Sequence, residues 1–379
     1  MMIAHGARAT RRVAQRVTGS RILILSAGVG GGHLAAAQGL QLELMTVAPQ
    51  VQVALRNGLG DDDTPLRFLL ERVTRWQLAV APRVYGWAYD SFVRSTVGRG
   101  MTMRALFTAT GRALRELIAS EHPDLVVSTY PGITAPLGML RASGQLTTPV
   151  CAVITDMASL HFWAHPGVDL HLASYAESLG EIAVISDGAP ARVVRAPLHR
   201  DHWELHDRCV RRAELGLGDR ERLVVVSGGG WGVGDLRGAV DAALRVSDVR
   251  VAIVCGQNAR VASRLAREFN AQTRVQVLGF VSAMAPLLSA ADVLVHSTGG
   301  MTCLEAAASG CPSIAYGFAH GHVKHNVSAM ARHGRLAHAA DALELTELLR
   351  DTLDAGPREA PPAGSHMWAS AAILGMLAS

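Results

Sequence analysis

Residues 296–326 combine glycines, hydroxyls and a carboxylate at spacings that could hold a phosphorylated ligand. An apolar strand comes first, the pair Gly299-Gly300 allows a tight turn, and the following helix carries Thr302 and Glu305. Unpaired N–H groups and the helix dipole at such an N-terminus favour a phosphate. A carboxylate one turn deeper can accept hydrogen bonds from two ribose hydroxyls. The segment therefore predicts a site for a nucleotide diphosphate.

A purely structural explanation of the same segment stays open. Glycine turns join strands to helices in any α/β protein, and glycine motifs often match by chance. An acidic residue near a helix N-terminus also stabilises the helix without binding anything.

Three further loops could meet this segment in a cleft, each following an apolar strand. They contain Gly31-Gly32-His33, Asp156, and Gly229-Gly230. A diphosphate site on one wall and a histidine on the other suit transfer from a nucleotide-activated donor. Fixed dipoles would stabilise the leaving diphosphate, and a base would take the proton of the attacking hydroxyl. His33 or Asp156 could be that base.

Short apolar runs alternate with amphipathic stretches along the 379 residues, which is typical of parallel sheets built from βαβ units. One series opens at 21–33 and a second at 222–236, each with a strand that enters a glycine loop. We predict an α/β protein in which two Rossmann-like parallel-sheet domains face each other across a cleft. The predicted domains are 1–200, which binds the acceptor, and 201–360, which binds the nucleotide-sugar. A C-terminal helix within 361–379 can pack back on the N-terminal domain.

Composition narrows the class of protein further. The apolar runs are too short to span a bilayer, and the first twenty residues lack the apolar segment of a signal peptide. Five scattered cysteines without CxxC pairing are typical of reduced thiols in the cytoplasm. The histidine groups lack a carboxylate or cysteine set that would complete a metal site, so we predict no metal.

Residues 65–119 interleave aromatic and aliphatic side chains with arginines. Such a surface suits the interface of an anionic membrane, which would place the protein peripherally on the inner face of the cell membrane. Ordinary amphipathic helices that pack inside the domain explain the pattern equally well. No nucleic-acid motif is present, so no nucleic-acid partner is expected.

Four motifs in order resemble the family-28 glycosyltransferases, namely the monogalactosyl- and glucosyl-diacylglycerol synthases and, more distantly, MurG. The motifs are SAGVGGGHLAAA, TDMASLHFWAHPGVD, GGGWGVGD and GFVSAMAPLLSAADVLVHSTGGMTCLEAAASGCPSI, and the similarity covers about residues 21–340. The resemblance implies a GT-B fold and an inverting, metal-independent hexosyl transfer from a UDP-sugar, without a further cofactor.

The resemblance also implies roles for individual residues. His33 and Asp156 would be catalytic. Acceptor contacts would come from Gly31, Gly32, His161 and Trp163. Nucleotide contacts would come from Gly229, Gly230, Phe280, Val281, Met284, Gly299, Gly300, Thr302 and Glu305. Donor-sugar contacts would come from His322 and Asn326.

One loop departs from the family pattern. The synthases usually have Gly-Gln-Glu before the asparagine, and this chain has Gly321-His322-Val323. A valine cannot accept a hydrogen bond from a sugar hydroxyl. From the resemblance as a whole we expect glycolipid synthesis, in which a hexose passes to a lipid hydroxyl such as that of diacylglycerol. Transfer to a soluble natural product is one alternative. Non-catalytic binding of a nucleotide-sugar is the other, and the altered loop is the reason for considering it.

Overall fold

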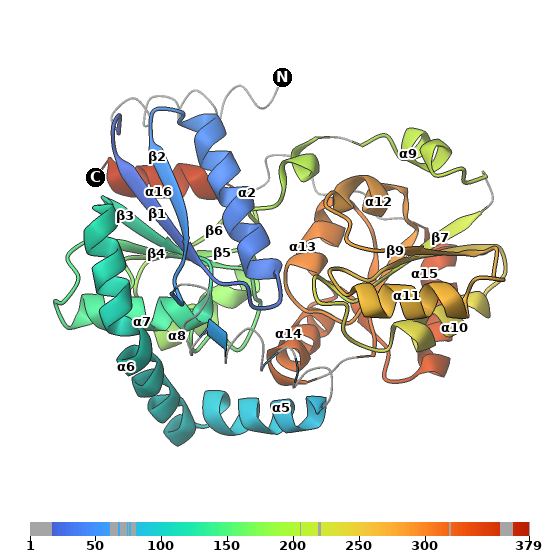
Figure 1. The fold of residues 1–379 in the computed structure, drawn as a ribbon, viewed down its shortest axis with the longest axis horizontal. Coiled ribbons are helices and arrows are strands. Elements are labelled where there is room, and N and C mark those ends of the chain that lie inside the picture. Colours follow the sequence, from blue (N-terminus) through green and yellow to red (C-terminus); the bar gives the residue numbers. More distant parts are fainter. Residues whose placement is uncertain are drawn as a thin grey trace.

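The computed structural model describes residues 17–60, 67–68, 74, 76, 81–204, 206–218, 221–317, 320–356 and 367–378. Within these residues the chain forms two six-stranded parallel sheets, one in each half, with helices against their faces (Figure 1). This confirms the predicted α/β class with two Rossmann-like domains. The ends 1–16 and 379 and the connection 357–366, which fall inside the predicted domains, lie outside the described residues.

The first sheet has the strand order β2-β1-β3-β4-β5-β6. Its strands are β1 (Arg21–Ser26), β2 (Gln52–Asn57), β3 (Leu125–Ser128), β4 (Val150–Ile154), β5 (Leu170–Ala173) and β6 (Ala191–Val193). The helices of this half are α2 (Gly32–Val47), α5 (Pro82–Tyr89), the π-helix η2 (Asp90–Arg94), α6 (Thr96–Glu121), α7 (Pro131–Ala142), η3 (Ala176–Ser178), α8 (Leu179–Ile185) and η4 (Arg200–Trp203).

Strand β1 shows why the central strands are apolar throughout. Successive side chains of a strand point to opposite faces, and both faces of this sheet are covered. Leu23 and Leu25 are buried in a core that α6 and α7 cover, whereas Ile22 and Ile24 are buried in a core beneath α2. Every position of the strand after the first is therefore buried, which gives the continuous run RILILS.

The second sheet has the order β12-β11-β10-β7-β8-β9. Its strands are β7 (Arg222–Ser227), β8 (Val249–Val254), β9 (Val275–Leu278), β10 (Val293–His296), β11 (Ser313–Ala315) and β12 (Ala337–His338). Its helices are α9 (Arg208–Glu214), α10 (Leu236–Leu244), α11 (Ala259–Glu268), α12 (Met284–Ala290), α13 (Met301–Ala308), α14 (Gly321–Arg332) and α15 (Ala342–Ala355). Helices α10 and α15 cover one face and α12 and α13 the other, so the central strands are again apolar on both sides.

The last helix, α16 (Ala369–Leu377), packs against α2 and completes the core of the N-terminal half. Inside this contact the Glu43 carboxylate on α2 accepts a hydrogen bond from the backbone N–H of Ser370 at 2.8 Å. Both residues are fully buried. The last described helix thus lies on the domain that contains β1 and α2, as Figure 1 shows.

A further apolar cluster joins the two halves. It combines Ala36, Met157 and Tyr175 of the first half with residues of α13 and α14, including Met301 and Val323. The two domains therefore meet through buried apolar surface. None of the described helices has both the length and the apolar character needed to traverse a lipid bilayer.

Candidate active site

The glycine loops after β1 and β7 touch each other across the domain boundary. A Cβ atom at Gly230 would lie 3.0 Å from the carbonyl oxygen of Gly30, and one at Gly31 would lie 3.7 Å from the Gly230 Cα. Gly31 also has a φ of 83°, in the left-handed region that favours glycine. Side chains at these glycine positions would push the two loops apart. The glycines therefore permit the close approach of the two domains.

Helix α2, which follows the β1 loop, begins close to the start of α13, which follows β10. A Cβ at Gly32, the first residue of α2, would lie 3.4 Å from the Met301 side chain at the start of α13, and the two helices are neighbours in Figure 1. Gly300, the N-cap of α13, offers no side-chain cap. The buried hydroxyl of Thr298, just before this turn, has no hydrogen-bond partner in the described part of the chain. The first turn of α13 therefore presents its N–H groups to the domain boundary, as the phosphate prediction requires.

Glu305 lies one turn into α13 and is partly buried. Burial raises the pKa of its carboxyl to about 7. No described residue makes a hydrogen bond to this carboxylate. Its oxygens therefore remain available to accept hydrogen bonds from hydroxyls of a ligand held at the N-terminus of the helix.

His33 lies in the first turn of α2, between two aromatic rings. Its ring centroid is 5.1 Å from that of Tyr130 and 5.5 Å from that of Trp163. Burial lowers the pKa of His33 to about 4, although Asp156 acts to raise it. The imidazole is therefore neutral at pH 7, and its buried Nδ1 has no partner in the described residues.

Asp156 follows β4 and brings a carboxylate of the N-terminal domain to the start of α13. Its Oδ2 accepts a hydrogen bond from the indole N–H of Trp163 at 2.8 Å. Its Oδ1 would lie 3.6 Å from a Cβ at Gly300. The structure thus brings His33 and Asp156, the two predicted catalytic residues, to the same part of the domain boundary.

The predicted acceptor contact of Trp163 is wrong in this structure. The side chain is 1 % exposed and belongs to the hydrophobic core, so it orients Asp156 through its indole N–H and cannot face an acceptor. His161, the other predicted acceptor residue of this loop, is partly exposed, and burial lowers its pKa.

The predicted sugar contact of Asn326 stays a prediction, because the buried Nδ2 of this side chain has no hydrogen-bond partner among the described residues. This side chain is fully buried, and its Oδ1 accepts hydrogen bonds from the backbone N–H groups of Met157 at 2.8 Å and Ala158 at 3.0 Å. It joins α14 to the loop that carries Asp156. Val323, in place of the expected glutamate, packs in the apolar cluster between the domains. His322 and Asn326, the two residues predicted to contact the sugar, both keep polar side chains in this region.

Phe280, Val281 and Met284 follow the carboxyl end of β9. The Phe280 side chain is 61 % exposed, whereas Val281 and Met284 pack against the core beneath α12. An exposed ring after a strand end is available to stack on a base. The role of these three residues in nucleotide binding stays a prediction.

Sequence reasoning missed Tyr85 and Tyr89 of α5 as members of the site. The Tyr85 hydroxyl lies 3.2 Å from Nδ1 of His322, and the Tyr89 hydroxyl lies 2.9 Å from Oγ of Ser159. Their i, i+4 spacing places them on one helix face, which was the available signal.

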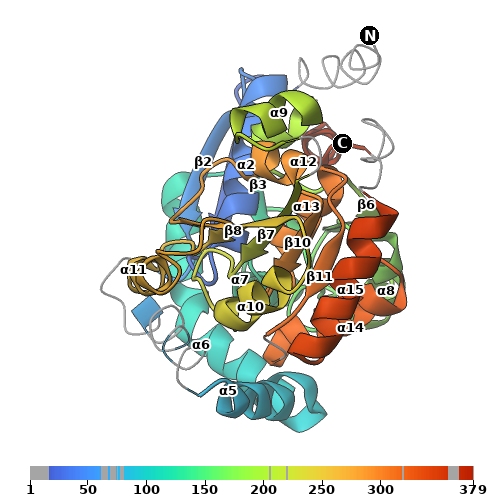
Figure 2. The same ribbon diagram turned by 90° about the vertical axis from the view of Figure 1, so that its right-hand side faces the viewer.

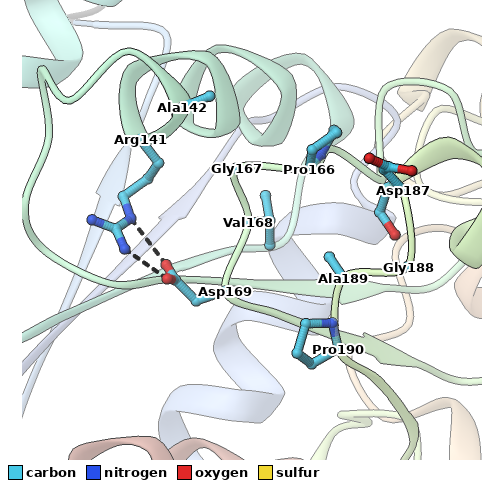
Figure 3. A pocket seen from close by; sticks show the side chains of 11 residues that line it. Arg141, Ala142, Pro166, Gly167, Val168, Asp169, Asp187, Gly188, Ala189 and Pro190 are labelled. Atoms are coloured by element: carbon cyan, nitrogen blue, oxygen red, sulfur yellow. Dashed lines mark hydrogen bonds and ion pairs between the residues drawn. The ribbon is translucent and has the colours of Figure 1, made fainter.

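The histidines do not gather into a metal centre in the described part of the chain, where no group of three or more His, Cys, Asp or Glu side chains could hold an ion. A cavity of about 610 Å³ does occur in the N-terminal domain (Figure 3). The ion pair of Arg141 with Asp169, 2.6 Å between NH2 and Oδ1, lies on its wall. Segments that precede β5 and β6 line it. It therefore lies at the amino ends of the strands, away from the carboxyl ends where ligands of open α/β sheets bind.

Comparison with known proteins agrees with this arrangement. The model of the monogalactosyldiacylglycerol (MGDG) synthase family matches residues 33–187, and that of the group 1 glycosyl transferases matches residues 224–355. Monogalactosyldiacylglycerol synthase 1 of Arabidopsis thaliana is 25 % identical over 89 % of this chain and 66 % of its own length. The processive diacylglycerol beta-glucosyltransferase of Bacillus licheniformis is 24 % identical over 82 % of this chain and 80 % of its own length.

Solved structures share the fold at lower identity. MurG of Acinetobacter baumannii superposes with a TM-score of 0.55 at 14 % identity, covering 94 % of this chain and 99 % of MurG. The spinosyn rhamnosyltransferase SpnG reaches 0.59 at 14 % identity and 95 % of both chains. The chain is therefore a glycosyltransferase of the GT-B fold, similar to the monogalactosyldiacylglycerol synthases over residues 33–187 and to the group 1 glycosyl transferases over residues 224–355.

Proposed function

We propose that the protein transfers a hexose from a UDP-sugar to a hydroxyl of a lipid acceptor such as diacylglycerol, with inversion at the anomeric carbon. The observation that carries this proposal is the meeting of His33 and Asp156 with the uncapped start of α13 and the unpaired carboxylate of Glu305. Two comparisons support a lipid acceptor. Residues 33–187 match the monogalactosyldiacylglycerol synthase family, and both relatives named above are named as enzymes that glycosylate diacylglycerol.

In this proposal the C-terminal domain binds the donor and the N-terminal domain binds the acceptor. The first turn of α13 holds the diphosphate, and Glu305 accepts hydrogen bonds from the ribose hydroxyls. Phe280 stacks on the uracil, and the backbone of Gly229-Gly230 approaches the donor from β7. The glycines Gly31 and Gly32 admit the acceptor beside His33, and His161 contributes from the loop that carries Asp156.

The reaction needs a neutral base and a stabilised leaving group. His33 is neutral at pH 7 because burial lowers its pKa to about 4, so it can take the proton of the acceptor hydroxyl. The oxygen attacks the anomeric carbon, the bond to the β-phosphate oxygen breaks, and the electron pair leaves with UDP. The charge of Asp156 stabilises the imidazolium that forms, and the α13 dipole stabilises the released diphosphate. This route requires no metal and no cofactor besides the donor.

The outer surface of α5 and α6 supports docking on an anionic membrane. Its exposed apolar side chains include Trp87 at 66 % and Val97 at 77 % exposure. Exposed arginines, among them Arg83 and Arg104, are interspersed with them. Apolar side chains and arginines together match the boundary between acyl chains and anionic headgroups. We propose that this surface holds the enzyme on the cytoplasmic face of the cell membrane. The residues 65–66, 69–73, 75 and 77–80 of the predicted membrane stretch lie outside the described part.

The decisive experiment is a transfer assay with UDP-glucose, UDP-galactose, UDP-N-acetylglucosamine and UDP-glucuronate, offered with diacylglycerol in anionic micelles. UDP release and product mass are followed together. A hexosyl-diacylglycerol product supports the proposal. UDP release that depends on a soluble alcohol but yields no glycolipid would transfer the proposal to a soluble acceptor. Tight UDP binding without turnover would favour a non-catalytic binder, for which the buried Val323 is the structural argument.

A further inference from the structure

Helix α5 belongs to the N-terminal half in sequence but packs against α14 of the C-terminal half. Both ribbon views show it running beneath α14, at the end of the molecule from which α6 projects (Figures 1 and 2). The helix therefore crosses the domain boundary at the loop that differs from the family pattern.

Tyr85 makes the closest contact of this crossing. A Cβ at Gly321 would lie 2.3 Å from Cε1 of the Tyr85 ring, so the ring rests directly on the first residue of α14. Gly321 also has a φ of 58°. The Tyr85 hydroxyl then reaches Nδ1 of the next residue, His322, at 3.2 Å. One turn further along α5, the Tyr89 ring stacks on His325 with 6.1 Å between the centroids.

The direction of the hydrogen bond between Tyr85 and His322 decides the tautomer of the imidazole. Nδ1 is the single acceptor that the described residues place within reach of this hydroxyl. Burial raises the pKa of Tyr85, which keeps the hydroxyl protonated at neutral pH. When this hydroxyl donates to Nδ1, the proton of the neutral imidazole is on Nε2.

The Nε2 atom has no hydrogen-bond partner among the described residues. Burial lowers the pKa of His322, although Asp156 acts to raise it, and His322 in turn acts to lower the pKa of His33. The ring therefore lies within electrostatic range of both catalytic candidates, and its Nε2 is without a partner in the described part of the chain.

We propose that Tyr85 is a positioning residue for the donor sugar, which fixes the tautomer and orientation of His322 so that Nε2–H donates to a sugar hydroxyl. The proposal rests on the proposed function, because it assumes that the cleft binds a UDP-sugar. It gives His322 the task of the glutamine that the related synthases usually have there. An amide presents its N–H donors without help, whereas an imidazole needs a partner that selects the nitrogen carrying the proton.

The test compares Tyr85→Phe with the wild type by calorimetric titration of UDP and of the most tightly bound of the four UDP-sugars. Phenylalanine keeps the ring on Gly321 and removes the hydroxyl. The variant should bind the UDP-sugar at least about fivefold more weakly, as expected for a lost hydrogen bond, and UDP within about twofold. Tyr316→Phe is the matched control, because the Tyr316 hydroxyl also bonds a side chain, Asp235 at 2.9 Å, but on the exposed surface.

A double-mutant cycle with His322→Gln separates positioning from general loss of packing. The Tyr85→Phe change should alter UDP-sugar affinity by less than about twofold in the His322→Gln background, since the amide needs no tautomer selection. Equal losses in both backgrounds, equal weakening of UDP and UDP-sugar, or unchanged UDP-sugar affinity of the single variant would each overturn the proposal. These experiments measure binding only. A protein that binds the UDP-sugar but transfers nothing would therefore contradict the proposed function and leave the proposed role of Tyr85 unaffected.

Discussion

Asn326 accepts a hydrogen bond from the backbone N–H of Met157 at 2.8 Å, and this bond joins α14 of one domain to the catalytic loop of the other. The same Oδ1 atom accepts the N–H of Ala158. One buried amide oxygen therefore satisfies two backbone donors across the domain boundary, and it places the Asp156 loop relative to α13.

We expect Asn326→Ala to loosen the closed arrangement of the domains. The change leaves two N–H groups of the Asp156 loop without an acceptor, which should lower the free energy of unfolding by about 1–3 kcal/mol. It should also increase the radius of gyration in small-angle scattering and lower kcat. Asn258→Ala is the matched control, since Asn258 also accepts a backbone N–H, that of Val261, but within its own domain. Equal scattering from the two variants would contradict the interdomain role.

His33→Ala should lower kcat by about 10²–10⁴-fold, the usual contribution of a general base, while UDP binding stays within about twofold. Because burial lowers the pKa of His33 to about 4, protonation of this histidine should not reduce kcat/KM of the wild type until the pH approaches that value. His338→Ala, a change at an exposed histidine on β12, is the control. A variant at position 33 with wild-type turnover would exclude the base assignment.

The elements of this fold could be predicted because their signals are local. The strand in residues 21–26 is apolar at consecutive positions, and each glycine loop follows its strand directly in the sequence. The same holds for Gly299-Gly300 and Glu305, which lie within one strand-turn-helix unit. The fold class and the strand-turn-helix unit that contains Gly299-Gly300 and Glu305 therefore followed from short windows of sequence.

The contacts between distant segments could not be predicted in this way. Asn326 has a side chain that suits a ligand, but its partner, the backbone of Met157, is 169 positions away and is fixed only when the tertiary structure forms. Tyr85 is 237 positions from His322. A resemblance to a family assigns a role to a residue from its position in a sequence motif. The interactions described here depend on which other segment of the chain packs against that residue.

Glu305→Gln should remove a pH dependence from UDP binding. Burial raises the pKa of this carboxyl to about 7, so in the wild type the ionised form, the stronger acceptor for ribose hydroxyls, gains population between about pH 6 and 8. UDP affinity should therefore increase with pH over this range more steeply in the wild type than in the variant. The protonation of UDP itself is common to both proteins and cancels in the comparison. Parallel affinity curves would show that Glu305 does not contact the nucleotide.

Trp87→Ser should weaken binding to vesicles that contain anionic lipid. The indole is largely exposed on α5, so its removal takes apolar area from the membrane contact with little effect on the core. We expect at least about a threefold loss in a sedimentation assay, and a further loss at high salt as the arginines are screened. Val184→Ala on α8, at 84 % exposure, provides the control for removing an exposed apolar side chain elsewhere. Equal vesicle binding of both variants would exclude the α5 surface.

Glu43→Gln should stabilise the protein at alkaline pH. Burial raises the pKa of Glu43 from 4.5 to about 7, so the folded protein keeps a proton that the unfolded chain has already released between these values. The free energy of unfolding therefore falls as the pH rises through this window, by up to about 3 kcal/mol. Glutamine can still accept the N–H of Ser370, and it carries no charge into the contact between α2 and α16.

Chemical denaturation at about pH 5 and pH 8 measures this difference, because the wild type should lose stability between the two values and the Glu43→Gln variant should lose less. At the lower pH the two proteins should be similar, since the wild-type carboxyl is then mostly neutral when folded. Glu116→Gln is the control, because the Glu116 carboxylate is exposed and pairs with Arg112 on the surface of α6. If Glu43→Gln lost as much stability as the wild type over this range, the carboxyl would be ionised in the folded state, and another donor besides Ser370 would have to hold it there.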